Sequence, residues 1–507
     1  MGKKSKRNKS KGPSSAGDAP SRPAPALRKD DNKEEVETKD NLRFEDPFVD
    51  EVEEDDVLQD DDGYDDEDAE MNDNEVVQSW NPLTGEALAE GQELEMDPSA
   101  YKMYHGLTPE WPSLSFDFLR DDLGESRTRF PHTLTAVVGT QAANPDENQI
   151  TVMRLSDLAR IHMETEDDIL GEEYNPNGGN DDDDDEESDD EEAVESDPVL
   201  ESFSIPHHGG VNRIRAMPQK TNIVATWSDS GNVSLFDVEP IVSKFSSKGP
   251  KQSASTTSSS EIKPFFVHSK HPTEGYAIDW SPVKQGIMAT GDCAGNIHIW
   301  TPRSEGSFEV VPAYDSKTYA AGQSTEHPSV EDIQWSPTEA TVFCTAECGG
   351  YVRVFDTRAP NRAMLSHKIQ SDGSDVNVVS WNKLVTNLLA CGGDDGVLSV
   401  WDLRHFSGGS KPDPLARFTT HKTPITSVEW HPSDESMLAA SDDVGTYVYD
   451  LSVEEDDNAG EVDVPPQLLF VHCGSEQFKE VHWHPQISSC LMTTALSGFS
   501  TFIPSNL

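Results

Sequence analysis

Val378–Asp402 reads VVSWNKLVTNLLACGGDDGVLSVWD, a unit of short apolar runs separated by turn residues. The first run ends at the anchor Trp381, a second run follows, and a third run closes on Trp401 after a turn that contains Gly396. Short apolar runs joined by Gly-containing turns predict antiparallel β-strands. Because one unit of this kind cannot bury its own apolar faces, we expect further copies along the chain.

The same unit recurs five more times. The copies share an apolar anchor and a closing aromatic residue; the anchors are Met217, Trp280, Trp335, Trp430 and Trp483, and the closing residues are Phe236, Trp300, Phe355, Tyr449 and Phe502. Each anchor precedes its closing residue by 19 or 20 positions, whereas successive anchors lie 46 to 63 positions apart. A constant unit with variable spacers is typical of the blades of a WD-repeat β-propeller, which run about 40–45 residues.

Six copies leave a seven-bladed ring one blade short. The paired runs Thr133–Gly139 and Gln149–Leu155 alternate apolar and polar residues and predict a degenerate first blade. The strand Ser113–Leu119 is then expected to pair with the last blade, which would remove the exposed sheet edges. The fold class is therefore all-β, a seven-bladed WD-repeat propeller over residues 125–503.

The chain is strongly acidic, with 94 Asp and Glu against 39 Lys and Arg and a formal charge of −55. This excludes a nucleic-acid binder that works through net charge, and we expect no direct nucleic-acid binding. Residues 44–76 and 161–198 contain acidic residues but no Lys or Arg. Residues 1–95, basic at first and then acidic, have the composition of a disordered tail. The second stretch, 161–198, is expected as an insertion between blades one and two.

An acidic run alone is equally consistent with solvation and with binding of a basic client. Two runs beside one propeller, with a third acidic loop at 452–466, favour client binding. Because each exposed ion pair contributes only about 0–1 kcal/mol, affinity must come from many pairs and a shaped site. The expected client-binding residues of the insertion are Asp181, Asp182, Asp183, Asp184, Asp185, Glu186, Glu187, Asp189, Asp190, Glu191 and Glu192.

The first eleven residues hold a compact basic cluster, formed by Lys3, Lys4, Lys6, Arg7, Lys9 and Lys11. Such a cluster is typical of a nuclear import signal, with a generic basic tail as the alternative. No apolar run approaches the roughly 18 residues that would span a bilayer, so we expect no membrane partner.

The sequence predicts no enzyme, cofactor or metal. It contains no phosphate loop, nucleophile elbow or metal triad, and its six cysteines form no Cys-x-x-Cys pair. Histidines recur eight or nine positions before several anchors, as His207, His271, His327 and His421. We expect them to hydrogen-bond turn aspartates such as Asp292 or Asp442, as scaffold rather than as catalysts or ligands.

Two segments resemble the histone-binding WD-repeat family. Tyr101–Leu114 is similar to that family's N-terminal helix and first strand, which places a helix and a closing strand in residues 96–124. Leu451–Pro466 resembles its acidic double-proline insertion between the last two blades. In the family these parts form a groove for a basic amphipathic helix. The resemblance therefore implies client-binding residues at Glu454, Glu455, Asp456, Asp457, Pro465 and Pro466.

The same resemblance implies a second surface at the central opening of the propeller. The family places acidic and aromatic side chains there, and the matching residues are Glu274, Tyr276, Glu331, Asp375 and Asn377. Two departures stand out, because Gly210 and Pro424 occupy positions where the family has Glu. They suggest a client other than histone tails.

The glutamate-rich WD-repeat proteins resemble the chain more closely. They share its basic start, the acidic segment before Trp80–Gly85, the motif Val138–Gln141 and the acidic insertion. That resemblance implies a chaperone dedicated to large-subunit ribosomal protein three, a basic partner that it shields until assembly onto pre-ribosomal particles. It further implies a monomer in the nucleus and nucleolus that shuttles through the cytoplasm.

Two alternatives remain open. Histones are the nearer one, through a role as a histone chaperone or chromatin subunit. The other is a ubiquitin-ligase substrate receptor, because Trp401–Arg404 and Phe355–Arg358 resemble the short box by which some propellers dock on a cullin adaptor. An aromatic-Asp-x-Arg ending is also a common blade terminus.

Overall fold

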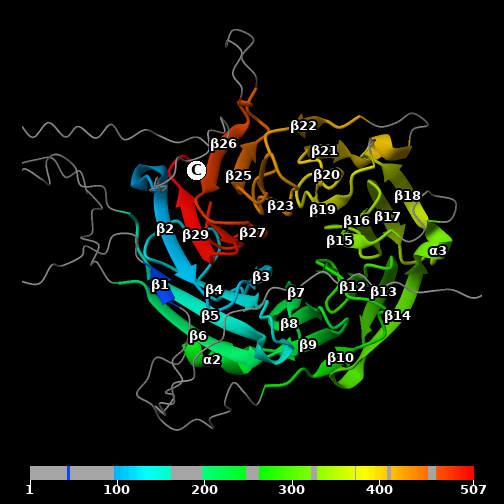
Figure 1. The fold of residues 1–507 in the computed structure, drawn as a ribbon, viewed down its shortest axis with the longest axis horizontal. Helices are drawn as coiled ribbons and strands as arrows, with labels where there is room; N and C mark the ends of the chain where they lie inside the picture. The colour runs from blue at the N-terminus through cyan, green and yellow to red at the C-terminus, as the bar shows by residue number, and fades with distance from the viewer. Residues whose placement is uncertain are drawn as a thin grey trace, which may run out of the picture. The chain divides into compact units, whose positions relative to one another are not determined.

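The structure, a computed structural model, describes residues 43–45, 96–161, 197–246, 262–320, 328–370, 373–407, 413–454 and 464–507. Within these ranges, seven antiparallel sheets stand around a common axis (Figure 1). Each of the first six sheets has four strands, and the chain runs outward from the axis through each sheet in turn. The predicted all-β, seven-bladed WD-repeat propeller is confirmed.

The strands of the first three sheets, innermost first, are as follows. The first sheet holds β3 (Ser115–Phe118), β4 (His132–Gly139), β5 (Gln149–Leu158) and β6 (Val199–Pro206). The second holds β7 (Val211–Met217), β8 (Lys220–Ser228), β9 (Val233–Asp237) and β10 (Phe266–His268). The third holds β11 (Ala277–Trp280), β12 (Met288–Gly291), β13 (Asn296–Pro302) and β14 (Phe308–Asp315).

The next three sheets repeat this order. The fourth holds β15 (Val330–Trp335), β16 (Val342–Glu347), β17 (Tyr351–Asp356) and β18 (Ala363–Lys368). The fifth holds β19 (Val376–Trp381), β20 (Leu388–Gly393), β21 (Leu398–Asp402) and β22 (Ala416–Phe418). The sixth holds β23 (Ser427–Trp430), β24 (Met437–Ser441), β25 (Gly445–Asp450) and β26 (Leu468–Cys473).

Helices are few and short. The described α-helices are α2 (Glu239–Ser246) and α3 (Ser316–Tyr319), and the 3-10 turns are η1 (Pro98–Ala100), η2 (Pro145–Glu147), η4 (Ser304–Gly306) and η5 (Leu403–Ser407). None of the helices in the described ranges is long and apolar enough to cross a membrane.

The seventh sheet joins both ends of the described chain. It contains β27 (Glu480–Trp483), β28 (Leu491–Thr494), β29 (Phe499–Pro504), β2 (Tyr101–Thr108) and β1 (Arg43–Glu45). β2 pairs antiparallel with β29, and β1 pairs with β2. The ring is therefore closed by an early segment, as expected, and a three-residue strand lies within the tail that was predicted to be disordered.

Two expectations for residues 96–124 were wrong. The closing strand is β2 (Tyr101–Thr108), whereas Ser115–Phe118, inside the predicted closing strand, forms the innermost strand of blade one. Residues 101–108 are extended, not helical, and the helical structure described in 96–124 is the single turn η1. Met103 and Leu107 are both buried, a spacing that a helix face and a strand face can share, so pairing with the edge of β29 decided the outcome.

Both acidic insertions were placed one step too late. Residues 161–198 separate β5 from β6, which belong to the same first sheet, where Ser156 pairs with Val199. The double-proline loop likewise separates β25 from β26 within the sixth sheet. The sequence repeat ends on the third strand of a blade, and the less patterned outer strand follows the insertion.

Neighbouring blades pack closely beside the axis. Glycine ends the second strand at Gly139 and Gly291, where a Cβ atom would come within 2.3 Å of Val211 Cγ1 and 2.5 Å of Val330 Cγ1. The absence of a side chain lets the next blade approach, which fixes the relative positions of adjacent inner strands.

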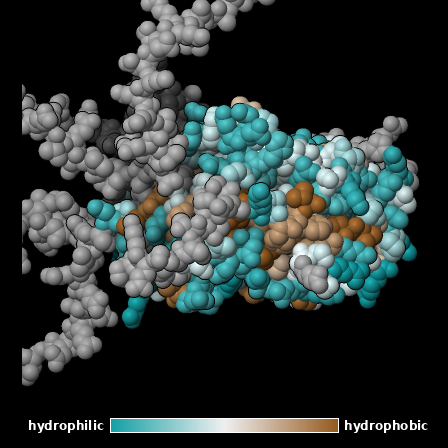
Figure 2. Space-filling model, turned by 90° about the horizontal axis from the view of Figure 1, so that it is seen from below, coloured by the Kyte–Doolittle hydropathy of each residue, from teal (hydrophilic) through white to brown (hydrophobic). Residues whose placement is uncertain are grey.

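The outer edges of the sheets are less polar in places. Figure 2 shows an apolar band on one side of the molecule among hydrophilic side chains. The exposed large apolar side chains include Val267 on β10 and Val311 on β14, which are 50% and 46% exposed. The polar groups that matter for function lie instead at the ends of the inner strands.

Candidate functional site

The five residues predicted at the central opening lie together. They occupy the starting ends of the adjacent inner strands β11, β15 and β19, and all are partly exposed: Glu274, Tyr276, Glu331, Asp375 and Asn377. We call Glu274, Glu331 and Asp375 the acidic rim. Among the described residues, no Lys or Arg is recorded in an ion pair with these three carboxylates, so their charge is open to a partner.

Glu274 is held from the preceding blades by neutral donors. Its Oε2 accepts a 3.0 Å hydrogen bond from Asn212 Nδ2, and Asn212 Oδ1 accepts one of 3.2 Å from Gln141 Nε2. Burial, and then the nearby Glu274, Cys293 and Glu331, raise the pKa of Tyr276. Tyr276 therefore stays a neutral hydroxyl between two carboxylates of the acidic rim.

The other two rim carboxylates have different roles. Glu331 Oε1 accepts a 3.2 Å hydrogen bond from the thiol of Cys348. Asp375 Oδ1 accepts one of 2.6 Å from the backbone N–H of Gly349, which has a positive φ of 80°. Asp375 therefore also stabilises a turn, whereas Glu331 bonds only a side chain.

Two acids beside the rim were missed in the sequence. Asp394 is exposed and accepts a 2.9 Å hydrogen bond from Asn377 Nδ2, and Asp443 lies 2.9 Å from Lys479 Nζ. Both belong to turns between the second and third strands of their blades. Acidic residues in those Gly-containing turns were a usable signal, because the turns end on the same face as the acidic rim.

A ring of hydrogen bonds around the axis was also missed. In most blades a polar side chain directly before the anchor accepts the backbone N–H of the next blade's anchor. These bonds are Asp279 to Trp335 (2.7 Å), Gln334 to Trp381 (2.8 Å), Ser380 to Trp430 (3.2 Å) and Glu429 to Trp483 (3.0 Å). The ring therefore links successive blades through atoms that the repeat places at constant positions.

Charged groups complete the ring between the last blade and the first two. Glu480, 1% exposed, accepts hydrogen bonds from Arg213 Nη1 (2.6 Å), Arg215 Nη2 (2.7 Å) and the backbone N–H of Phe116 (2.9 Å). Burial alone would raise the pKa of Glu480, but Arg215 and Arg213 outweigh it and hold that pKa well below its usual value. The carboxylate is therefore ionised at neutral pH.

His482 lies between two of these carboxylates. Its Nδ1 is 3.0 Å from Glu429 Oε2 and its Nε2 is 3.6 Å from Glu480 Oε1. Burial lowers the pKa of His482, but Glu429 and Glu480 raise it more, to about 9, so the ring is protonated at pH 7. This cluster has buried charges and stabilising partners, and it serves the closure of the propeller.

Replacing Asp279 by asparagine is expected to stabilise the protein at pH 8 by about 1–3 kcal/mol. Burial raises the pKa of Asp279 to about 7, against the opposing Trp335 N–H. An acid with a raised pKa stabilises the fold below its unfolded value near 4 and loses that contribution as pH rises through 7. Asparagine can still accept the Trp335 N–H. Thermal unfolding between pH 4.5 and 8 should show the difference shrinking towards low pH; a constant difference would contradict it.

The repeat histidines have the predicted structural role. His271 Nδ1 bonds Asp292 Oδ2 at 2.8 Å, and His421 Nδ1 bonds Asp442 Oδ2 at 3.2 Å. His207 differs, because it bonds the Gly209 carbonyl and Thr226. His327 lies outside the described residues.

One group of histidines has atoms close enough to hold a metal. Ligand atoms of His268, His271 and His298 lie within 4.8 Å of one another, and all three side chains are buried. His271, however, uses both ring nitrogens on Asp292 and Thr290, and His268 Nε2 bonds His298 Nδ1 at 3.0 Å. These contacts satisfy the three rings within the protein.

Several predicted site residues fall outside the described residues. They are Asp181–Asp185, Glu186, Glu187 and Asp189–Glu192 of the insertion, Glu455, Asp456 and Asp457 of the double-proline loop, and the basic cluster at residues 3–11. Glu454 and Pro466 are exposed and Pro465 is partly exposed. Gln467 Nε2 donates a 2.8 Å hydrogen bond to the Val453 carbonyl, which ties the two ends of the loop together.

The two aromatic-Asp-x-Arg endings have a local explanation. Arg404 folds back onto Asp402, and Arg358 onto Asp356, each through its Nε and a terminal nitrogen. The Arg side chains remain 72% and 73% exposed. The motif therefore ends a blade strand with an ion pair whose outer face is accessible.

The fold and the acidic rim define a WD-repeat propeller with an anionic central face. Two family models match the sequence. The first, which describes the histone-binding protein RBBP4 and a component of the CAF1 complex, matches residues 91–159. The second, "WD domain, G-beta repeat", matches residues 412–443.

Three relatives cover most of the chain. Protein HEAT STRESS TOLERANT DWD 1 of Arabidopsis thaliana is 39% identical, over 84% of this chain and 91% of its own. Ribosome assembly protein rrb1 of Schizosaccharomyces pombe is 36% identical, over 90% and 92%. Glutamate-rich WD repeat-containing protein 1 of Dictyostelium discoideum is 39% identical, over 83% of each chain. The chain belongs to this family of glutamate-rich WD-repeat proteins.

Proposed function

We propose that the protein is a chaperone in the biogenesis of the large ribosomal subunit. It binds a newly made basic ribosomal protein, large-subunit protein three, and shields it until the protein joins a pre-ribosomal particle. The observation that carries the proposal is the acidic rim, three carboxylates on adjacent blades without a recorded Lys or Arg partner in the described part of the chain. The relative named ribosome assembly protein supports the cellular process.

The mechanism follows from charge and geometry. A free ribosomal protein exposes Lys and Arg that rRNA later neutralises, and the rim offers carboxylates at fixed positions for some of them. Since each exposed pair adds only about 0–1 kcal/mol, the rigid rim supplies selectivity while the acidic insertion adds further pairs and speeds association. The double-proline loop, with Glu454, is a second proposed contact. rRNA, with a higher charge density, would release the client by competing for the same cations.

The client and the basic cluster at residues 3–11 point to one location. Assembly of the large subunit begins where the pre-ribosomal particles are, so we place the protein in the nucleus and nucleolus, reached through that cluster as an import signal. Capture of a newly made ribosomal protein further implies shuttling through the cytoplasm.

Deleting residues 166–198 is expected to weaken client binding about tenfold and to flatten its salt dependence. The deletion removes acidic residues and no Lys or Arg, so fewer ions are exchanged on binding. Fluorescence titration of the purified client at several salt concentrations measures both quantities. A variant with a neutral linker of the same length controls for loop length. Equal affinity and equal salt slopes in all three proteins would remove the insertion from the mechanism.

Histone binding is the second candidate, favoured by the match of residues 91–159 to the histone-binding family model. The rim itself differs from that family at two positions. Gly210 cannot take a side chain without movement, because a Cβ atom there would lie 2.6 Å from Gln141 Oε1, and Pro424 carries no charge. The rim therefore has two carboxylates fewer than the resemblance implies for a histone-binding propeller.

A further inference from the structure

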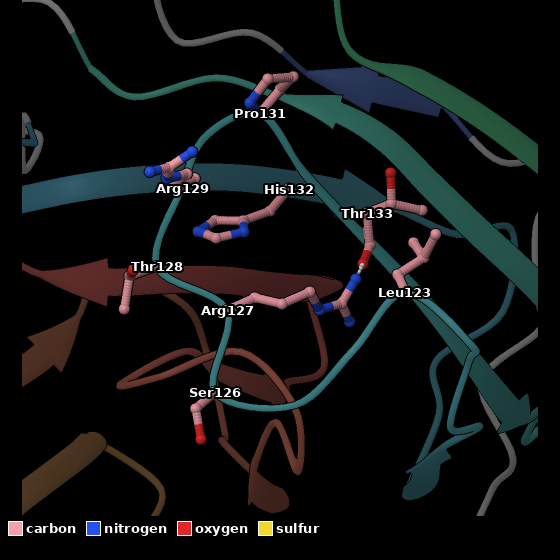
Figure 3. Close-up of a pocket in the computed structure, with 8 residues that line it drawn as sticks. All are labelled: Leu123, Ser126, Arg127, Thr128, Arg129, Pro131, His132 and Thr133. Carbon is pink, nitrogen blue, oxygen red and sulfur yellow. Dashed lines mark hydrogen bonds between the residues drawn. The ribbon is translucent and has the colours of Figure 1, made fainter. Parts of the chain in front are cut away.

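The loop between β3 and β4 forms a pocket at the opposite end of blade one from the acidic rim. The cavity has a volume of about 430 Å³ and is lined by eight residues, shown in Figure 3. The lining includes Arg127, Arg129 and His132, with the hydroxyl groups of Ser126 and Thr128, and none of the eight residues is acidic. A cationic pocket is unexpected in a chain with a formal charge of −55.

The loop is held in place by the last blade. The Arg127 N–H donates to the Gln486 carbonyl at 2.8 Å, and the Ser488 N–H donates to the Arg127 carbonyl at 3.0 Å. Gln486 Oε1 accepts a further 2.9 Å bond from the Asp121 N–H. Ser126 has a φ of 50°, a left-handed conformation that a residue with a side chain adopts at a cost. The pocket is therefore formed before any ligand arrives.

Several polar groups of the pocket have no partner within the described chain. Arg127 donates from Nη1 to the Thr133 carbonyl (3.1 Å) and from Nη2 to Asp121 (3.0 Å), but its buried Nε makes no hydrogen bond. Arg129 is exposed and takes part in no hydrogen bond or ion pair recorded there.

His132 is the most buried of these groups. It is 2% exposed, its ring packs against Phe130 with centroids 4.4 Å apart, and no hydrogen bond of its ring is recorded in the described chain. Figure 3 shows the loop curving around this imidazole. Buried polar groups without partners are rare and costly, and a ligand that offers acceptors would satisfy them.

We propose that this pocket binds the phosphate group of a phosphate monoester. Arginine guanidinium groups match phosphate oxygens in charge and geometry, and Arg129 and the Nε of Arg127 are available for them. The Ser126 and Thr128 hydroxyls and one imidazole N–H of His132 supply further donors. Three terminal phosphate oxygens suit this divergent set better than the two oxygens of a carboxylate.

The charges around His132 agree with an anionic ligand. Burial, and then Arg127, lower the pKa of His132 to about 4, so its ring is neutral at pH 7. His484 from the last blade is likewise neutral, because burial and then Arg127, His132 and Arg120 lower its pKa. Asp121 and Glu125 are the nearby acids, and each is paired, with Arg127 and with Arg120.

Calorimetric titration of the full-length protein with inorganic phosphate tests the proposal. We expect saturable binding at one site that sodium chloride of equal ionic strength does not reproduce, and at least a tenfold loss of affinity in Arg129→Ala. Because Arg129 is exposed and makes no recorded contact, that loss cannot come from unfolding. Arg303→Ala, which removes an exposed arginine from blade three, is the matched control and should bind normally. Equal affinity of Arg129→Ala and the unmodified protein would overturn the proposal.

Two monoesters identify the source of the phosphate. O-phosphoserine stands for a modified protein side chain and adenosine monophosphate for a nucleotide; the tighter ligand indicates the natural class, and its binding must also depend on Arg129. If neither monoester binds, a monoester pocket is refuted. Because the pocket and the acidic rim lie at opposite ends of the blades, Arg129→Ala leaves client binding unchanged, so the two proposals fail separately.

Discussion

Replacing Glu480 by glutamine is expected to lower the free energy of unfolding by about 3–5 kcal/mol. Glu480 is 1% exposed and neutralises Arg213 and Arg215, whose side chains are only 13% and 16% exposed. Its loss would leave two guanidinium groups and the protonated His482 together at the axis without their central carboxylate. Removing one member of a buried ion pair costs this much because the remaining charge has no solvent to replace it.

Denaturant unfolding at pH 7 measures the effect. Glutamine keeps an acceptor for the Phe116 N–H, so the loss reports the charge more than the shape; alanine removes both and should cost more. Glu476→Gln, at an exposed acid just before the same strand, should stay within about 0.5 kcal/mol of the unmodified protein. A change below about 1 kcal/mol in Glu480→Gln would show that the cluster does not hold the ring closed.

The largest expected effect on binding comes from reversing two charges of the acidic rim. The double variant Glu274→Lys with Glu331→Lys should bind the basic client at least about 100-fold more weakly. Each reversal removes an attraction of up to about 1 kcal/mol and adds a repulsion of similar size, and about 1.4 kcal/mol is a factor of ten in affinity. Asp375 is left unchanged, because it also accepts the Gly349 N–H that holds a turn.

The matched control reverses two acids at the other end of the blades. Glu339→Lys with Glu435→Lys changes the net charge by the same amount at exposed positions between first and second strands. Binding measured by fluorescence anisotropy should be nearly unchanged in this control. If both double variants lose affinity equally, the client responds to net charge, and the rim has no special part in binding.

The ring could be predicted because its signal is repeated. Trp280, Trp335, Trp430 and Trp483 mark the innermost strands, and in each case the indole Nε1 donates to a backbone carbonyl of the preceding blade. A residue that makes the same contact in several blades appears at the same place in each repeat. The rim residues lie at fixed offsets from these anchors, which is why the sequence placed them together.

The parts that failed lack that repetition. β2 occurs once, and its buried Met103 and Leu107 fit a helix or a strand until the edge of β29 selects the strand. The outer strands follow insertions of different length, so blade boundaries shifted. The Glu480 cluster and the His132 pocket each join chain segments more than 300 residues apart, and such contacts leave no local pattern.

The most direct test is a comparison of clients under one set of conditions. The purified full-length protein is titrated with large-subunit ribosomal protein three, with histones H3 and H4, and with a neutral protein of similar size, all at the same salt concentration. We predict that the ribosomal protein binds at least tenfold more tightly than the histones and that the neutral protein does not bind. Tighter binding of the histones, or no preference for either basic protein over the neutral one, would contradict the proposed function.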